Sequence, residues 1–349
     1  MSAAYTPSQP GAVYVMTNQL TGNAVVAFTR AADGTLTMAG TFPTGGLGNG
    51  MAGTVDPLMS QSSLILSADN RFLFAVNALS NDISVLAIDE HGLTLVDKVA
   101  SGGMMPVSLT HRDGLLYVLN AVDGTITSFI QNPDGTLTPL DGSTQTLIGG
   151  PTSAPAQVAF TPDGSLLVAT EKATNVIDTF AVDADGRAGP PMRNESSGQI
   201  PFGFAIARED LVIVSEAGSG AASSYRIDTG GTLKVISGSV PSNQIAPCWV
   251  AVNDSANPRY AYTSNTGSNS LSGYAIGDDG ALSLLNADGV TAVTNPAPID
   301  SAVADSRFLY VIADGSGNVD AFQIEPDGSL TPITGVSGLP LGLQGIAAY

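Results

Sequence analysis

The sequence predicts an all-β fold, a seven-bladed β-propeller of four-stranded antiparallel blades, and three observations carry this prediction. The first is a strand-rich module over residues 154–188, the second is its recurrence along the chain, and the third is the composition. With 40 Gly, 21 Pro and 43% hydrophobic residues in 349, the chain is rich in turns and apolar enough to bury a large core.

The module has the pattern of a compact antiparallel sheet. We expect strands at 157–161, 166–170 and 176–182, because these runs are short and apolar-rich and the third alternates apolar and polar residues. Pro162-Asp163-Gly164 predicts the first hairpin turn and Asp185-Gly186 the turn into a fourth strand, since glycine can take the positive φ that closes a hairpin. One such sheet leaves a face uncovered, so copies of the module must stack on one another.

The module recurs along the whole chain. The glycine of its last turn marks each copy at intervals of about 50 residues, which is typical of a propeller blade and not of a helical solenoid. The seven positions are Gly34, Gly92, Gly135, Gly186, Gly231, Gly280 and Gly328. A propeller grows by adding blades around one axis, so we predict a single domain over residues 12–349 after an N-terminal arm at 1–11.

The first blade lacks its innermost strand. Residues 12–18 match the second strand of the module with no first strand before them, and residues 343–349 match a first strand with nothing after it. Pairing these segments would close the ring and remove two bare sheet edges. We therefore expect the two ends of the domain to be adjacent in space.

An inserted loop at residues 43–62 makes the first glycine spacing the longest of the series. It contains Gly48-x-Gly50-x-x-Gly53, which binds dinucleotide phosphates only between a strand and a helix. Val55-Asp56-Pro57 follows here and no helix is predicted, so we expect a flexible loop that could cover a pocket.

The later blades keep the strand order of the module. Their second strands are expected at 72–77, 115–120, 166–170, 212–216, 260–265 and 309–314. Both histidines, His91 and His111, fall at predicted hairpins, where we expect exposed turn roles and not catalysis. Cys248, the single cysteine, excludes an intramolecular disulfide and is expected to be a small buried residue.

The charge balance limits the partners. Twelve Lys+Arg against 31 Asp+Glu give a net charge of −19, which repels nucleic acid and anionic lipid. No run is apolar enough for a membrane span, and the N-terminus lacks the pattern of a signal peptide. We therefore predict a soluble, monomeric and cytoplasmic protein, with secretion as the alternative, that binds a small-molecule ligand or substrate.

Polar side chains are expected to gather at one mouth of the ring. The hairpin that joins the first and second strands lies at the opposite face, so the ends of second strands and the starts of first strands meet at this mouth. The second strands end at Asn18, Asn77, Asn120, Glu171, Glu216, Asn265 and Asp314. The first strands start at Ser63, Ser108, Gln157, Gly203, Trp249, Asp300 and Gln344. Such a ring around a central channel is suited to binding a small ligand.

Glu171 and Glu216 are the predicted catalytic pair. Asn and Asp at strand ends often bond their own backbone, whereas Glu does so less readily. Two carboxylates on consecutive blades could divide acid and base roles, or they could bind Ca²⁺ or Mg²⁺, and both alternatives stay open. No other cofactor and no dedicated metal site is predicted. The residues expected to bind substrate are Gln157, Lys172, Arg193, Trp249, Asn265, Asp300, Asp314 and Gln344.

The recurring pattern is a first strand, a Pro-Asp-Gly turn, a second strand and, later, an Asp-Gly-x-Leu turn. This order resembles that of the seven-bladed lactonase family, which includes 6-phosphogluconolactonase-like and carboxymuconate cyclase-like proteins. The pattern is visible at 160–186 and 309–330, and the resemblance covers residues 12–349. In that family Pro-Arg-His opens a blade and Asn-Glu closes its second strand. Here Pro155-Ala156-Gln157 and Thr170-Glu171 stand at those places, so only the glutamate carries over.

The resemblance implies a lactonase-like hydrolase, or a related lactonizing or isomerising enzyme, acting on a cyclic ester with Glu171 as acid/base. Without the arginine and histidine, a neutral or weakly charged substrate is expected, because anionic substrates need cationic partners. The alternatives are a non-catalytic propeller that binds a small ligand or a protein, and a cation-dependent hydrolase that uses the carboxylates of the mouth.

Overall fold

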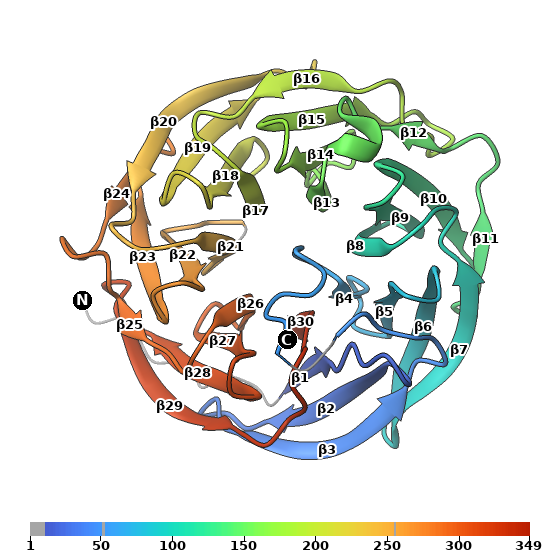
Figure 1. Ribbon diagram of the computed structural model, residues 1–349, viewed down its shortest axis with the longest axis horizontal. Helices are drawn as coiled ribbons and strands as arrows, with labels where there is room; N and C mark the ends of the chain where they lie inside the picture. The colour runs from blue at the N-terminus through green and yellow to red at the C-terminus, as the bar shows by residue number, and fades with distance from the viewer. Residues whose placement is uncertain (1–10, 51–52, 255) are drawn as a thin grey trace.

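The computed structural model describes residues 11–50, 53–254 and 256–349 and confirms the seven-bladed propeller (Figure 1). Seven antiparallel sheets surround a central axis, and each sheet runs outward from a first strand beside the axis to a fourth strand at the rim. The predicted arm at 1–11 lies outside the described residues except for Gly11, which begins the strand β1.

Blades 1 to 4 follow one another around the ring. Blade 1 consists of β30 (Ile346–Ala348), β1 (Gly11–Met16), β2 (Ala24–Arg30) and β3 (Leu36–Pro43). Blade 2 consists of β4 (Leu64–Leu66), β5 (Phe72–Asn77), β6 (Asp82–Asp89) and β7 (Gly92–Ala100). Blade 3 consists of β8 (Pro106–Arg112), β9 (Leu115–Asn120), β10 (Thr125–Gln131) and β11 (Leu137–Pro139), with β12 (Gln145–Thr146) also on β10. Blade 4 consists of β13 (Pro155–Phe160), β14 (Leu166–Glu171), β15 (Val176–Ala181) and β16 (Met192–Glu195), preceded by the short 3₁₀ helix η1 (Gly150–Thr152).

Blades 5 to 7 complete the ring. Blade 5 consists of β17 (Pro201–Ala207), β18 (Leu211–Glu216), β19 (Ala221–Ile227) and β20 (Leu233–Pro241). Blade 6 consists of β21 (Pro247–Val252), β22 (Tyr260–Asn265), β23 (Ser270–Ile276) and β24 (Leu282–Leu284), with β25 (Ala292–Val293) also on β23. Blade 7 consists of β26 (Pro298–Ala304), β27 (Phe308–Ala313), β28 (Asn318–Ile324) and β29 (Leu330–Val336).

The two ends of the chain meet in blade 1, as the incomplete first unit predicts. β30 pairs antiparallel with β1, Val13 opposite Ala348 and Val15 opposite Ile346. The pairing extends by a bond from the Tyr349 N–H to the Ala12 carbonyl at 3.0 Å. The C-terminal strand therefore supplies the missing innermost strand and closes the ring.

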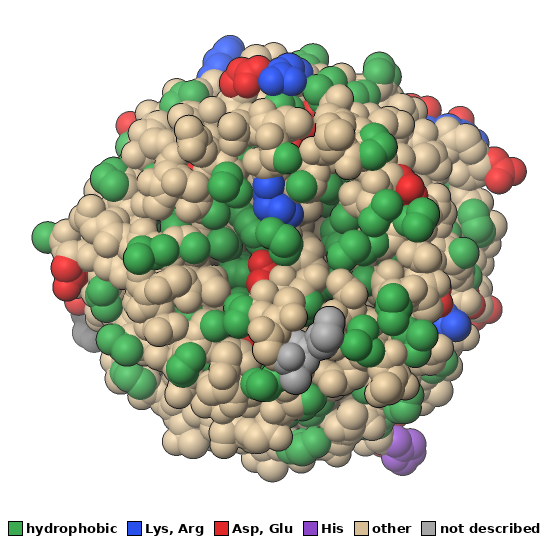
Figure 2. Space-filling model, in the orientation of Figure 1, with side chains coloured by type: hydrophobic (Ala, Val, Ile, Leu, Met, Phe, Trp, Pro, Cys, Tyr) green, Lys and Arg blue, Asp and Glu red, His purple; other side chains and the backbone are tan. Residues whose placement is uncertain are grey.

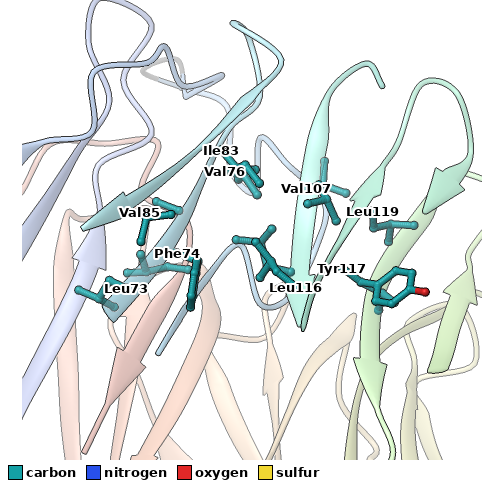
Figure 3. Packing of buried hydrophobic residues seen from close by; sticks show 14 of the residues in the cluster. Leu73, Phe74, Val76, Ile83, Val85, Val107, Leu116, Tyr117 and Leu119 are labelled. Atoms are coloured by element: carbon teal, nitrogen blue, oxygen red, sulfur yellow. The ribbon is translucent and has the colours of Figure 1, made fainter. Parts of the chain in front are cut away.

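The core lies between neighbouring blades. Every residue of β5, β14, β18 and β27 is buried, because a second strand is covered on both faces by adjacent blades. Figure 3 shows this packing between blades 2 and 3, where Phe74 and Val85 face Leu116 and Val107. The fourth strands are largely exposed, since they have solvent on their outer side.

Five first strands begin in the same irregular way. β8, β13, β17, β21 and β26 each start with proline and carry a β-bulge directly after it. The residue before each proline has a positive φ, between 46° and 59°: Met105, Ala154, Ile200, Ala246 and Ala297. A bulge re-aims the side chain that follows it, so the same local irregularity sets the direction of the first side chains in these five blades.

Candidate active site at the centre of the ring

The segment Met59–Ser62, which we call the plug, lies across the central channel. The Ser60 carbonyl accepts hydrogen bonds from Trp249 Nε1 at 2.7 Å and Gln344 Nε2 at 2.8 Å, and the Ser60 hydroxyl donates to the Val107 carbonyl at 2.8 Å. The loop between β3 and β4 enters the centre of the ring in Figure 1. The insertion predicted as a flexible loop is therefore held at its end by blades 1, 3 and 6.

Gln61 fixes the plug to blades 4 and 6. Its Nε2 donates to the Val250 carbonyl at 2.9 Å, its Oε1 accepts from the Val250 N–H at 3.0 Å, and its own N–H donates to the Ala156 carbonyl at 3.1 Å. A Cβ at Gly203 would collide with Gln61 Oε1. Glycine at position 203 thus makes room for the buried amide.

Lys172 and Asp56 form the charged part of the site. Lys172 is 8% exposed, and its ammonium donates to the carbonyls of Met59 at 2.7 Å and Pro155 at 2.8 Å, with the Phe202 ring centroid 5.0 Å away. These bonds use two of the three ammonium donors. Asp56 is half-buried, beside Lys172 and the Gln344 amide.

Burial brings both groups toward neutrality. Desolvation lowers the pKa of Lys172 to about 8, although the Asp56 charge opposes the change. Desolvation likewise raises the pKa of Asp56 to about 7 against the opposing effect of Lys172. Figure 2 shows a hollow at the centre of this face, with basic and acidic side chains visible within it.

Asp300 and Gln344 line the same centre. Asp300 is 2% exposed, and burial raises its pKa well above the usual range, with the Asp56 charge adding to the effect. Four buried oxygens here have no hydrogen-bond partner among the described residues: Asp56 Oδ1, Ser63 Oγ, Asp300 Oδ2 and Gln344 Oε1. Buried polar atoms ordinarily have partners, so this group of oxygens is equipped to bind a polar ligand.

The structure places the predicted catalytic pair elsewhere. Glu171 accepts from the Gly149 N–H at 2.8 Å and from the Thr174 hydroxyl, and Glu216 accepts from the Gly198 N–H at 2.8 Å and from the hydroxyls of Ser223 and Ser239. Both side chains are 0% exposed. Each glutamate closes its own loop network, and no hydrogen bond joins them within the described chain. Their catalytic role stays a prediction that these contacts do not favour.

The same loop contact recurs at the other ends of second strands. Four of these side chains each form a hydrogen bond with a loop that joins one blade to the next. The pairs are Asn18 with Asn49, Asn77 with Thr44, Asn120 with Ser101, and Asp314 with Gly342. Asn265 bonds Ser270 and Ser272 within its own blade. Four of these five residues therefore tie a blade to a loop between blades, and the binding of substrate by Asn265 and Asp314 stays a prediction.

The starts of the first strands do reach the channel. Trp249 and Gln344 hold the plug, Gln157 donates to the Ser62 hydroxyl at 3.4 Å, and Asp300 lies beside Asp56. Gln157 also accepts from the Phe204 N–H at 2.7 Å, which links blades 4 and 5. Of the residues expected to bind substrate, these four and Lys172 are the ones that the fold brings together.

Arg193 and His111 differ from expectation. Arg193 was expected to bind substrate at the mouth but lies in the outer strand β16, 47% exposed and paired with Glu195 at 2.6 Å, because blade 4 has its fourth strand there. His111 was expected at an exposed turn but lies in β8, half-buried and stacked on Phe74 with ring centroids 4.9 Å apart. His91 is 85% exposed at its turn and Cys248 is buried, as predicted.

Sequence reasoning missed Asp56 and the plug. Asp56 precedes proline in the insertion, and a loop without periodicity carries no pattern that places it at the axis.

Among the described residues no group of three His, Cys, Asp or Glu side chains converges as a metal site would require. Binding of Ca²⁺ or Mg²⁺ therefore stays a prediction.

In the described part of the chain, no helix has the length and apolar composition needed to cross a membrane.

Solved structures of similar shape come from several bacteria. A protein assigned as a 6-phosphogluconolactonase from Bacteroides fragilis is 20% identical with a TM-score of 0.73, covering 98% of this chain and 99% of its own. The Pseudomonas aeruginosa periplasmic gluconolactonase PpgL is 18% identical with a TM-score of 0.76, covering 97% of this chain and 99% of its own. At these identities the likeness shows the fold.

The family follows from the sequence itself. No curated protein sequence matches this chain. The sequence model described as "Lactonase, 7-bladed beta-propeller" matches residues 5–146 and 110–251, which together span more than half of the chain. The chain belongs to the seven-bladed β-propeller lactonase family.

Proposed function

We propose that this protein is a lactonase-like hydrolase that opens a small cyclic ester at the centre of the ring, on the face where the plug lies. The observation that carries the proposal is the neighbouring pair Asp56 and Lys172, whose pKa values of about 7 and 8 suit acid–base work near neutral pH. Family membership supports the reaction class.

The pair can divide the steps of ester hydrolysis between them. Asp56 as carboxylate takes a proton from a water molecule while the water oxygen bonds to the ester carbonyl carbon. The remaining ammonium donor of Lys172 stabilises the oxyanion that forms. The ring C–O bond then breaks, and the leaving alkoxide takes the proton from Asp56, so the product is the open hydroxy acid.

We propose a neutral substrate on grounds of charge. Lys172 has the carboxyl group of Asp56 beside it, and the carboxyl group of Asp300 lies beside Asp56 in the same centre. A phosphate group would meet more acidic than basic groups there. Between the substrates that the named relatives suggest, an uncharged gluconolactone therefore fits this site better than its 6-phosphate.

The test is hydrolysis of neutral and phosphorylated lactones by the wild-type protein, Asp56→Asn and Lys172→Met. We expect each variant to lose at least about 100-fold in kcat/KM, which corresponds to removal of a general base or an oxyanion donor. Asp113→Asn and Lys234→Met are matched controls, because those side chains are 86% and 71% exposed on the surface. Melting temperatures of all variants separate loss of chemistry from loss of fold.

Several outcomes would contradict the proposal. Failure of the wild-type protein to hydrolyse any lactone, with or without Ca²⁺ or Mg²⁺, would leave a ligand-binding propeller. Activity lost to a chelator and restored by Ca²⁺ would favour the cation-dependent alternative. Loss of turnover in Glu171→Gln at unchanged melting temperature, with Asp56→Asn active, would return the acid/base role to Glu171.

A further inference from the structure

The face of the ring opposite the plug carries the hairpins that join first and second strands. A hollow of about 600 Å³ lies there, lined by the ends of β21, β26 and β30 and by the hairpin residues beyond them. We call it the hairpin-side hollow. Its polar lining residues are Arg30, Asn70, Asn253, Asp254, Ser301, Asp305 and Ser306, and Tyr349 also lines it.

The hairpin-side hollow is distinct from the site at the plug. β26 begins at the plug face, where Asp300 lies beside Asp56, and ends in the hairpin at Asp305. The far end of the hollow at Asp305 lies roughly 17 Å from Asp300, and its lining runs along β26 back to Ser301, which directly follows Asp300. None of the residues that hold the plug lines this hollow.

The lining offers hydrogen-bonding groups that the protein does not use. The hydroxyls of Ser301 and Ser306, the Asn70 amide and Asn253 Nδ2 have no hydrogen bond within the described chain. Asn253 Oδ1, in contrast, accepts from the N–H groups of Arg259 and Tyr260 and so fixes the hairpin. Donors and acceptors of this kind match the alternating hydroxyl groups of a polyol.

The charges at the hollow compensate one another. Arg30 is 1% exposed and pairs with Asp305 at 2.6 Å, which satisfies the basic group and leaves Asp254 as a further acidic side chain. Among the described residues that line the hollow, an anionic ligand would therefore meet only a basic group that is already paired. Ala251, Val303 and Ala348 add an apolar wall, and Tyr349 adds a ring on which the C–H face of a sugar can pack.

From these observations we infer that the hairpin-side hollow is a binding site for a neutral saccharide, separate from the site of the proposed hydrolysis. Its volume falls within the range of small-molecule pockets. The unused amides and hydroxyls would hold the sugar hydroxyls, and the apolar wall would cover one face of the ring.

The experiment measures binding of glucose, maltose and gluconate to the full-length protein by calorimetry. We expect the neutral sugars to bind and gluconate not to bind. In the double variant Ser301→Ala/Asn253→Asp, which keeps the Asn253 acceptor but removes a hydroxyl and an amide donor, we expect affinity to fall about tenfold or more. Ser283→Ala, at an exposed strand position on the rim, is the matched control.

Two results would overturn the inference. One is the absence of binding of either neutral sugar up to the millimolar range. The other is binding that survives in Ser301→Ala/Asn253→Asp but is lost in Asp56→Asn or Lys172→Met, which would place the sugar at the plug. A test of lactone hydrolysis in the double variant, expected at the wild-type rate, keeps this inference independent of the proposed function.

Discussion

At the scale of single residues, the pKa values of Asp56 and Lys172 set the pH range in which the proposed chemistry can run. Asp56 must be ionised to act as base, so activity should rise as the pH passes about 7. Lys172 must be protonated to stabilise the oxyanion, so activity should fall as the pH passes about 8.

We therefore predict a narrow, bell-shaped profile of kcat/KM between these two values. The measurement is the rate of lactone opening from pH 5 to 10 in the wild-type protein and in Lys234→Met. A profile that rises without a maximum up to pH 10 would show that Lys172 is not required in its charged form.

A second pair of ionisable residues predicts a pH effect on stability. Asp178, 0% exposed, lies beside Glu171, and burial together with the hydrogen bond and charge of Glu171 raises the pKa of Asp178 to about 8. Between pH 4 and 8 the folded protein keeps a proton that the unfolded chain releases. The contribution of Asp178 to the free energy of unfolding is therefore greatest at acid pH and falls as the pH rises toward 8.

Asp178→Asn should remove this dependence. Asparagine can still accept from the Ile148 N–H, which Asp178 Oδ2 does at 3.0 Å. At pH 8 we expect the variant to be more stable than the wild-type protein by at least about 1 kcal/mol, since one unit of pKa difference corresponds to about 1.4 kcal/mol. Denaturant unfolding at pH 5 and pH 8 checks this, with Asp185→Asn, 78% exposed, as control. An equal change in both variants would refute the assignment.

At the scale of elements, the repeated start of the first strands stores backbone strain. Ala297 has a φ of 57° directly before Pro298, and a left-handed conformation costs an alanine about 1–2 kcal/mol. Glycine would avoid that cost but lose about 0.5–1 kcal/mol through the entropy of the unfolded chain. Ala297→Gly should therefore stabilise the protein by up to about 1.5 kcal/mol.

Ala302→Gly is the matched control for Ala297→Gly, because Ala302 lies within the same strand at ordinary β geometry. It should destabilise by about 0.5–1 kcal/mol, the usual cost of glycine in a strand. Denaturant midpoints of both variants give the comparison. Destabilisation of the same size at both positions would mean that the turn at Ala297 is not strained.

The plug is the element that makes a site out of the channel. Through Ser60 and Gln61 it links blades 1, 3, 4 and 6, and its Met59 carbonyl positions the Lys172 ammonium. Asp56 then reaches the axis from the same loop. Without the loop that carries the plug, Lys172, Asp300 and Gln344 would still come from the blades, but the proposed base Asp56 would be missing.

At the scale of the whole molecule, ring closure should control cooperative unfolding. β30 buries Ile346 and Ala347, and the segment before it buries Leu343 and holds the plug through Gln344. Removing residues 343–349 takes away two large apolar side chains worth about 1.5–3 kcal/mol each and leaves strand edges unpaired in blade 1.

We expect the truncated protein to lose at least about 3 kcal/mol of stability and to aggregate through its open edges. Size-exclusion chromatography and denaturant unfolding measure both effects. Conversion of Tyr349 alone to Ala, which leaves β30 in place, is the control. A truncated protein as stable as the wild-type protein would show that closure depends on other contacts.

The repeat made much of the architecture predictable. Strand alternation and turn residues are local signals, so they located the blades, the order of strands and the mouth to which the first strands point. The unmatched segments at 12–18 and 343–349 predicted closure, because an incomplete blade needs a partner strand. Trp249, Asp300 and Gln344 were placed at the channel by the same geometry.

The contents of the channel depended on tertiary structure. Glu171 and Glu216 have the chemistry of catalytic residues, yet loops from the preceding blades bond them, and no sequence pattern indicates where those loops settle. Asp56 lies in an aperiodic insertion that reaches the axis only because Trp249, Gln344 and Val250, far apart in the chain, bind the plug. Its pKa, like that of Lys172, results from desolvation, which exists only once the blades enclose the centre.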